Sequence, residues 1–119
     1  MSVAGGERDS FPDGDSARNI IVQGMVEGLR ELGEDAATST LFFIKTRGGV
    51  ELEEIPDNPE KLCHTLREIF GVGSGLLMRS IRDKIRERLH KANEHERGHV
   101  THFISHLDRC IASVEAGIV

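Results

Sequence analysis

The chain has 119 residues and a formal net charge of −5, with 38% hydrophobic and 29% charged residues. These values are ordinary for one soluble globular domain, and they exclude a strongly basic nucleic-acid binder and a disulfide-dense secreted scaffold. No apolar run approaches the ~20 residues that span a bilayer, so no membrane partner is predicted. The five Phe, without Trp or Tyr, indicate a mainly aliphatic core.

The two cysteines, Cys63 and Cys110, fall in different predicted helices and lack the Cys-x-x-Cys spacing of a metal finger. A reduced, intracellular pair is the default interpretation, and a single bridge between two helices is the alternative. The N-terminal residues have neither a basic start nor an apolar segment, which argues against a signal peptide. A cytoplasmic location is therefore predicted.

Residues 1–14 are rich in Gly, Asp and Ser and predict a disordered tail. Asp15 or Ser16 is expected to cap a first helix, which Gly33 ends. Its predicted apolar stripe recurs at helical spacing through Ile21, Met25, Gly28 and Leu32. Gly24 and Gly28 form a small-xxx-small pair, which predicts close approach of a neighbouring helix.

Residues 35–47 fit two structures. The run from Thr38 to Thr46 is rich in strand formers, and the following Arg-Gly-Gly can close a β-hairpin. Against this, Ala37, Leu41 and Ile44 keep helical spacing, and Asp35 would place a negative charge in the first helical turn. A lone two-stranded hairpin is also hard to place in a helical chain, so a helix is predicted, with Gly48 at its C-terminal cap.

The segment Asn58-Pro59-Glu60 predicts a strong helix start, and Gly71 is expected to stop that helix. The next helix follows from about Ser74 and has the best periodicity in the chain. Its apolar positions are Met78, Ile81, Ile85, Leu89 and Ala92. A capping box of Asn93 with Glu96 predicts a break before the last helix; the alternative is one unbroken helix from Gly75 to Ala116.

The predicted fold is all-α, a small bundle of four to five helices. Residues 1–14 form the tail, 15–92 a helical domain, and 93–119 a C-terminal amphipathic helix. The apolar face of that last helix is larger than a small domain is expected to cover, which predicts a homodimer through this segment. The residues of this predicted interaction face are Val100, Phe103, Ile104, Leu107, Ile111 and Val114.

One pattern resembles a known family. The segment Glu-Leu-Glu-Glu-Ile-Pro-Asp-Asn-Pro-Glu-Lys-Leu, the later Ile-Phe-Gly and the Leu-Leu-Met-Arg-Ser-Ile after a glycine-rich turn are similar to the archaeal Nitrosopumilus-type output domain family. The resemblance covers about residues 17–91. It implies an all-helical module, found alone or attached to signalling proteins, and it implies no reaction and no defined ligand.

A histidine stripe near the C-terminus is the main candidate for chemistry. His95, His99, His102 and His106 fall at i, i+4, i+7 and i+11, a band about 60° wide on a helix. Imidazoles four residues apart can share a metal, and Cys110 extends the series beyond His106. One helix supplies two good ligands per ion, so a zinc or similar site needs a second helix or subunit; Cys63, His64 or a second copy are the candidates. The alternatives are solvated surface histidines and a pH-responsive helix.

Other chemistry has less support. Arg79, Arg82 and Arg86 can contact phosphates, but they are interleaved with acidic residues in an acidic chain, so nucleic-acid binding is not favoured. A solvated helix flank or a docking surface for the acidic N-terminal half is the preferred interpretation of this basic helix. No phosphate loop or nucleophile–base pair occurs, and no enzyme activity or obligatory cofactor is predicted. The predicted function is a self-associating protein-interaction or signalling output module; the alternative is a metal-binding or metal-sensing helical protein.

Overall fold

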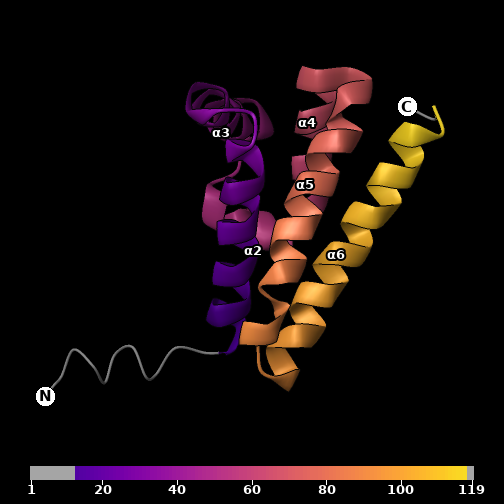
Figure 1. Ribbon diagram of the computed structural model, residues 1–119. Helices are drawn as coiled ribbons and strands as arrows, with labels where there is room; N and C mark the ends of the chain where they lie inside the picture. Colours follow the sequence, from indigo (N-terminus) through magenta and orange to yellow (C-terminus); the bar gives the residue numbers. More distant parts are fainter. Residues whose placement is uncertain (1–12, 118–119) are drawn as a thin grey trace, which may run out of the picture.

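The computed structural model describes residues 13–117, which contain five α-helices and no strand (Figure 1). The all-α prediction is confirmed. The predicted tail 1–14 lies outside the described residues except for its last two, which begin the first helix, two residues before the predicted start at Asp15. The helices are α2 (Asp13–Arg30), α3 (Glu34–Gly48), α4 (Pro59–Phe70), α5 (Ser74–Glu87) and α6 (Glu94–Glu115), with 3₁₀ segments η1 (Leu52–Asp57), η2 (Gly71–Gly73) and η3 (Leu89–Lys91).

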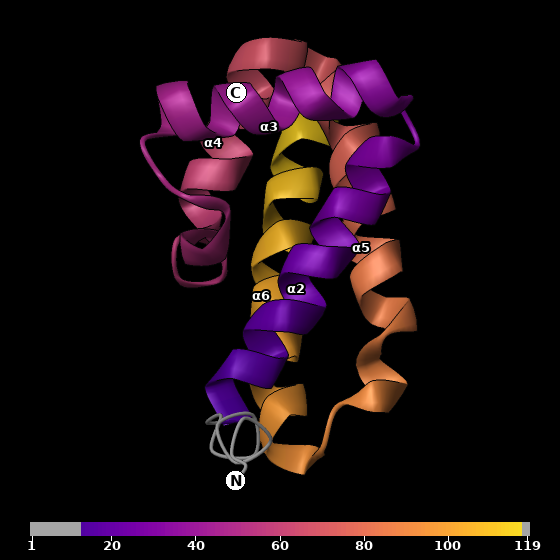
Figure 2. The same ribbon diagram turned by 90° about the vertical axis from the view of Figure 1, so that its left-hand side faces the viewer.

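Three long helices, α2, α5 and α6, pack against one another and form the body of the molecule. Helix α5 runs antiparallel to both neighbours, and α3 crosses one end of this group (Figure 2). Helix α4 packs on α3, on α5 and on α6, and so bridges the crossing helix to the body. The contact between α4 and α6 brings together two segments that are distant in the sequence, and it holds the site described below.

Helices α2 and α5 approach each other closely at two glycines. A Cβ atom added at Gly28 would lie 2.7 Å from the Cα of Ile81, and one added at Gly24 would lie 2.8 Å from the Cα of Ile85. Real Cβ atoms do not approach backbone atoms this closely, so only glycine, which has no Cβ, fits at either position. The predicted close approach at the small-residue pair is confirmed.

Residues 34–48 form helix α3, so the helix predicted in place of a hairpin is confirmed. Ala37 and Ile44 are buried, as their helical spacing predicts. The left-handed C-cap is Gly49 (φ 70°, ψ 25°), one residue later than predicted. Leu32 does not continue the buried stripe of α2: it follows the end of that helix at Arg30 and is 44% exposed, and Leu29 is fully buried in its place.

Helices α5 and α6 are separate, as the capping signal predicts: α5 ends at Glu87 and α6 begins at Glu94. The side chain of Asn93 accepts a hydrogen bond from the backbone N–H of Glu96 at 2.8 Å, and the Glu96 carboxylate accepts one from the Asn93 N–H at 3.0 Å. These bonds satisfy backbone donors that the first turn of a helix leaves unpaired. The unbroken helix from Gly75 to Ala116 is therefore excluded.

Removing this cap should lower the stability of the protein by a measurable amount. Asn93→Ala is expected to lower the free energy of unfolding by about 1 kcal/mol, because the N–H of Glu96 loses its acceptor. Asn58 is the matched control: it precedes α4 but its side chain accepts no cap hydrogen bond, so the loss for Asn58→Ala should be smaller. Urea unfolding of both variants measures the difference, and equal losses would contradict this role of Asn93.

The apolar face of α6 is already covered within the chain. All six residues of the predicted interaction face are buried, at 0–5% exposure. They pack against α2, α4 and α5 and belong to the same hydrophobic core as Met25, Leu66 and Ile81. The prediction that this face is left for a second copy is wrong, because the long α2 and α5 helices provide more covering surface than the sequence suggested.

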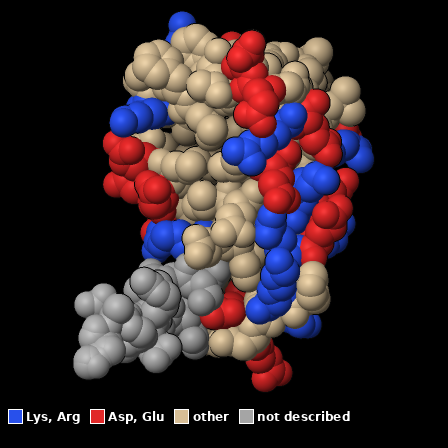
Figure 3. Space-filling model, turned by 60° about the vertical axis from the view of Figure 1, so that its left-hand side comes forward, with Lys and Arg blue, Asp and Glu red and all other residues tan. Residues whose placement is uncertain are grey.

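The basic residues of α5 are paired with acidic residues from its two neighbours. Lys84 lies 3.3 Å from the carboxylate of Glu31, the residue after α2, and Arg88, the residue after α5, pairs with Glu27 of α2. Towards α6, Arg79 donates two hydrogen bonds to Glu115 at 2.5 and 2.6 Å. Basic and acidic side chains therefore interleave on the surface (Figure 3). Of the two interpretations of the basic helix, docking against the acidic N-terminal half applies to Lys84 and Arg88, whereas Arg79 pairs with the C-terminal helix.

Candidate metal centre

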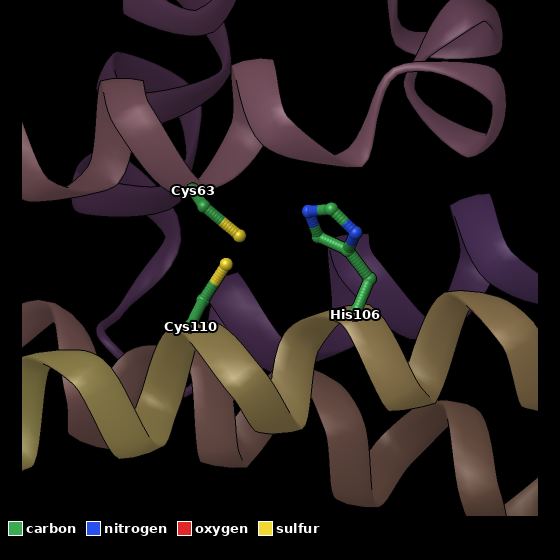
Figure 4. A group of neighbouring side chains, drawn as sticks. All are labelled: Cys63, His106 and Cys110. Atoms are coloured by element: carbon green, nitrogen blue, oxygen red, sulfur yellow. The ribbon is translucent and has the colours of Figure 1, made fainter.

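The candidate site lies where α4 crosses α6 and combines one residue of α4 with two of α6 (Figure 4). On α4, Cys63 follows Leu62 and precedes Leu66, both fully buried, so the thiol lies at the edge of the core. On α6, the buried residues Phe103, Leu107 and Ile111 define the core stripe. His106 and Cys110 come one residue earlier than Leu107 and Ile111, which places them on the flank that faces α4.

The ligand atoms of Cys63, His106 and Cys110 all lie within 4.8 Å of one another. Figure 4 shows both sulfur atoms directed into the space between the helices, with the imidazole beside them. A tetrahedral zinc ion, with bonds of about 2.0–2.3 Å, holds its donor atoms roughly 3.3–3.8 Å apart. Since the observed atoms lie within 4.8 Å of one another, a contraction of at most about 1.5 Å is needed, which side-chain rotation can supply.

Cys63 is buried, whereas His106 and Cys110 are partly exposed. The group is therefore open to solvent from the α6 side and closed on the α4 side. An ion or small molecule can reach it without local unfolding, while the buried thiol keeps one side of the site dry. Partial exposure of two of the three donors is compatible with exchangeable binding.

A hydrogen bond links the two thiols. A hydrogen bond from the Cys63 thiol lowers the pKa of Cys110 to about 7, against the opposing effect of partial burial, with smaller contributions from Arg67 and Arg109. The same hydrogen bond, followed by burial, raises the pKa of Cys63 well above its usual range. The first proton therefore leaves the pair from the more exposed sulfur, and the thiolate is the form that binds metals.

Arg67 supplies positive charge beside the pair. It lies one turn after Cys63 on α4, and its Nε is buried without a hydrogen-bond partner among the described residues. Its charge favours the thiolate form of both cysteines, while the Glu60 carboxylate acts in the opposite direction. A buried N–H donor without a partner is costly, and an anionic group bound at the adjacent site would offset that cost.

The structure splits the predicted histidine stripe. Only His106 and Cys110 join the candidate centre; His95, His99 and His102 line a separate cleft of about 660 Å³ near the start of α2. The rings of His95 and His99 lie edge to face with centroids 5.1 Å apart. Of the predicted stripe, only the His106/Cys110 pair therefore meets a ligand from a second helix, because different neighbours pack against the two ends of α6. Metal binding by the other histidines stays a prediction.

Of the predicted second-helix ligands, Cys63 reaches the centre and His64 does not. His64 is exposed, and its Nε2 lies 3.5 Å from the Glu68 carboxylate on the same helix. The two residues are adjacent, so they point about 100° apart on α4. The orientation of α4 relative to α6 thus directs Cys63, and not His64, toward the candidate centre.

The arginines considered for nucleic acid lie elsewhere, on α5, and face carboxylates. Arg82 donates to Asp108 at 3.1 Å, Arg86 lies 4.0 Å from the same residue, and Arg79 is held by Glu115. A phosphate would have to compete with these acidic partners. This arrangement favours a structural role in joining α5 to α6.

Large exposed apolar side chains occur at the end of the molecule that α3 crosses. They lie after α2, on α3, in η2 and in the first turn of α5: Leu32, Phe42, Val72 and Leu76. The prediction of a self-associating or signalling module stays a prediction, and its self-association no longer has the α6 face as support. Among the described residues, no helix is both long and apolar enough to cross a membrane.

Comparison with known proteins adds no further assignment: no family model matches the chain, and no curated protein or solved structure is significantly similar to it. The resemblance to the archaeal output domain family therefore stays a prediction.

Proposed function

We propose that this protein binds one thiophilic divalent metal ion, of which zinc is the representative, through Cys63, His106 and Cys110. The observation that carries the proposal is the convergence of three metal-ligating atoms within 4.8 Å of one another from two different helices. This is the predicted alternative function, with a corrected ligand set. The rest of the histidine stripe is not required.

The donor set favours particular ions. Two thiolates and one imidazole suit borderline or soft metals such as zinc, whereas magnesium and calcium require oxygen ligands. Two thiolate charges neutralise a divalent cation, so the bound site would carry little net charge despite its partial burial. Three protein ligands leave one tetrahedral position for water or an external ligand, the arrangement of exchangeable rather than closed structural sites.

Metal binding would also connect two parts of the fold. Cys63 belongs to the short helix α4, and the other two ligands belong to α6 in the body of the molecule. An ion held by all three would therefore fix α4 against α6. Such coupling between an ion and helix packing supports a metal-responsive role, because the occupied and free proteins would differ in the stability of α4.

Zinc titration of the reduced, untagged full-length protein tests this proposal. We expect one ion per chain, and at a free zinc concentration of 100 times Kd a gain of about 2.7 kcal/mol in the free energy of unfolding. Cys63→Ser and His106→Gln should each weaken binding by more than about 100-fold, since loss of a direct ligand costs more than loss of an outer partner. Calorimetry and thermal melting measure both effects.

His95→Gln is the matched control for His106→Gln, because it makes the same substitution on the same helix outside the cluster. It should leave stoichiometry and affinity unchanged. If Cys63→Ser retained zinc binding and His95→Gln lost it, the zinc site would instead lie in the cleft near α2. Absence of zinc uptake by the reduced native protein would refute the proposal.

A further inference from the structure

Cys63 and Cys110 form a facing pair in addition to their place in the metal centre. Both are free thiols, and their sulfur atoms lie within 4.8 Å of each other across the α4–α6 contact. Figure 4 shows the two sulfur atoms pointing toward each other with no labelled group between them. Their exposure differs, since Cys63 is only 3% exposed while Cys110 is partly open to solvent.

We propose that this pair is a site of reversible oxidation, at which a hydroperoxide reacts with Cys110 and Cys63 then closes an intramolecular disulfide. Cys110 is the partner that a small oxidant can reach. Cys63 is the partner that is already in place, because it is buried against the first sulfur. The proposal rests on the position and exposure of the two thiols, and the disulfide needs no metal.

The reaction proceeds in two balanced steps. The Cys110 sulfur attacks one peroxide oxygen, so that an S–O bond forms, the O–O bond breaks and hydroxide leaves; with hydrogen peroxide the product is a sulfenic acid and water. The Cys63 sulfur then attacks the sulfenic sulfur, forming the S–S bond and breaking the S–O bond, with a second water as product. In total, two thiols and one hydrogen peroxide give one disulfide and two waters.

The fold provides the reach that this reaction needs. A disulfide bond is about 2.05 Å long, so the sulfur atoms must approach by less than about 3 Å. The cross-link joins the same two helices that the metal would join. Oxidation should therefore preserve the helical fold and raise its melting temperature, because the bond closes a long loop in the unfolded chain.

Oxidation and metal binding exclude each other at this site. A disulfide supplies no thiolate, so the oxidised protein retains only His106 of the proposed ligand set, and a bound ion would be released. This consequence rests on the proposed function, but the disulfide itself does not. The centre would then hold metal under reducing conditions and release it on exposure to peroxide.

The test treats the reduced, metal-free, full-length protein with one equivalent of hydrogen peroxide. We expect titratable thiols to fall from two to zero per chain, the intact mass to drop by two hydrogens, and peptide mapping to show a Cys63–Cys110 link that a dithiol reverses. Cys63→Ser should accumulate a sulfenic acid at Cys110 that dimedone traps. Cys110→Ser should react at least about tenfold more slowly, because its remaining thiol is buried.

His106→Gln separates the two proposals, since it removes a metal ligand and keeps both thiols. Disulfide formation in this variant without zinc binding supports both. Zinc binding by the native protein without disulfide formation overturns the oxidation proposal alone, and disulfide formation without zinc binding by the native protein overturns the metal proposal alone. A disulfide between two chains, seen as a doubled mass on a non-reducing gel, or equal peroxide reactivity of the two serine variants, also contradicts the mechanism.

Discussion

Replacing Phe103 with alanine is expected to lower the free energy of unfolding by about 3–5 kcal/mol. Phe103 is the largest fully buried side chain in the described chain, at 1% exposure in the centre of the α6 face. Its removal loses the transfer free energy of the ring and leaves a cavity that rigid helices cannot fill. The expected loss is a large share of the stability of a domain this size. Chemical denaturation of the native and variant proteins measures it.

Phe42→Ala is the matched control, because it makes the same chemical change at a residue of α3 that is 60% exposed. It should change stability by no more than about 0.5 kcal/mol. The two variants also test whether the α6 face is core or a contact between copies. If its face were a contact between copies, Phe103→Ala would alter the native mass at unchanged monomer stability, and that result would contradict the buried position of Phe103.

Gly28→Ala is expected to destabilise the protein by about 1–3 kcal/mol, although alanine is the better helix former. The added Cβ would lie 2.7 Å from the Cα and 2.8 Å from the backbone N of Ile81. These are backbone atoms of a packed helix, so α2 and α5 must separate, and contacts along the whole interface are lost. For a domain of about 100 residues, each kcal/mol corresponds to a fall of about 4–8 °C in Tm.

Gly98→Ala is the control with the opposite sign. Gly98 lies inside α6, its added Cβ meets no atom within 4 Å, and its φ lies outside the left-handed range. The substitution should therefore raise stability by about 0.5–1 kcal/mol through helix propensity alone. Thermal melting of both variants gives the comparison, and a stabilised Gly28→Ala would show that the α2–α5 interface is looser than described.

The candidate site could be predicted only in part. Its α6 ligands, His106 and Cys110, follow from a spacing of four residues on one helix, which local geometry fixes. Cys63 was one of several candidate partners, and only the crossing of α4 over α6 selects it over His64. His95 lies apart from this group for a related reason: a continuous stripe on an isolated helix enters two environments when different neighbours cover its two ends.

What the sequence determined by itself was local. Helical periodicity predicted the all-α class, and Asn58-Pro59 and the Asn93–Glu96 box predicted two helix starts. Gly24 and Gly28 predicted a close helix contact but did not identify the neighbouring helix. These signals act within one or two turns of helix, so no tertiary information is needed to interpret them. The resemblance and the signalling function remain untested predictions.

The tertiary structure decided which surfaces remain free. An amphipathic pattern shows that α6 has a face to bury, but it does not show whether the same chain has enough surface to cover it. Here α2, α4 and α5 cover it, so Phe103 and its neighbours are core rather than interface. The same packing brings two distant thiols and an imidazole together, because side chains on the flanks of buried stripes meet only where two helices cross.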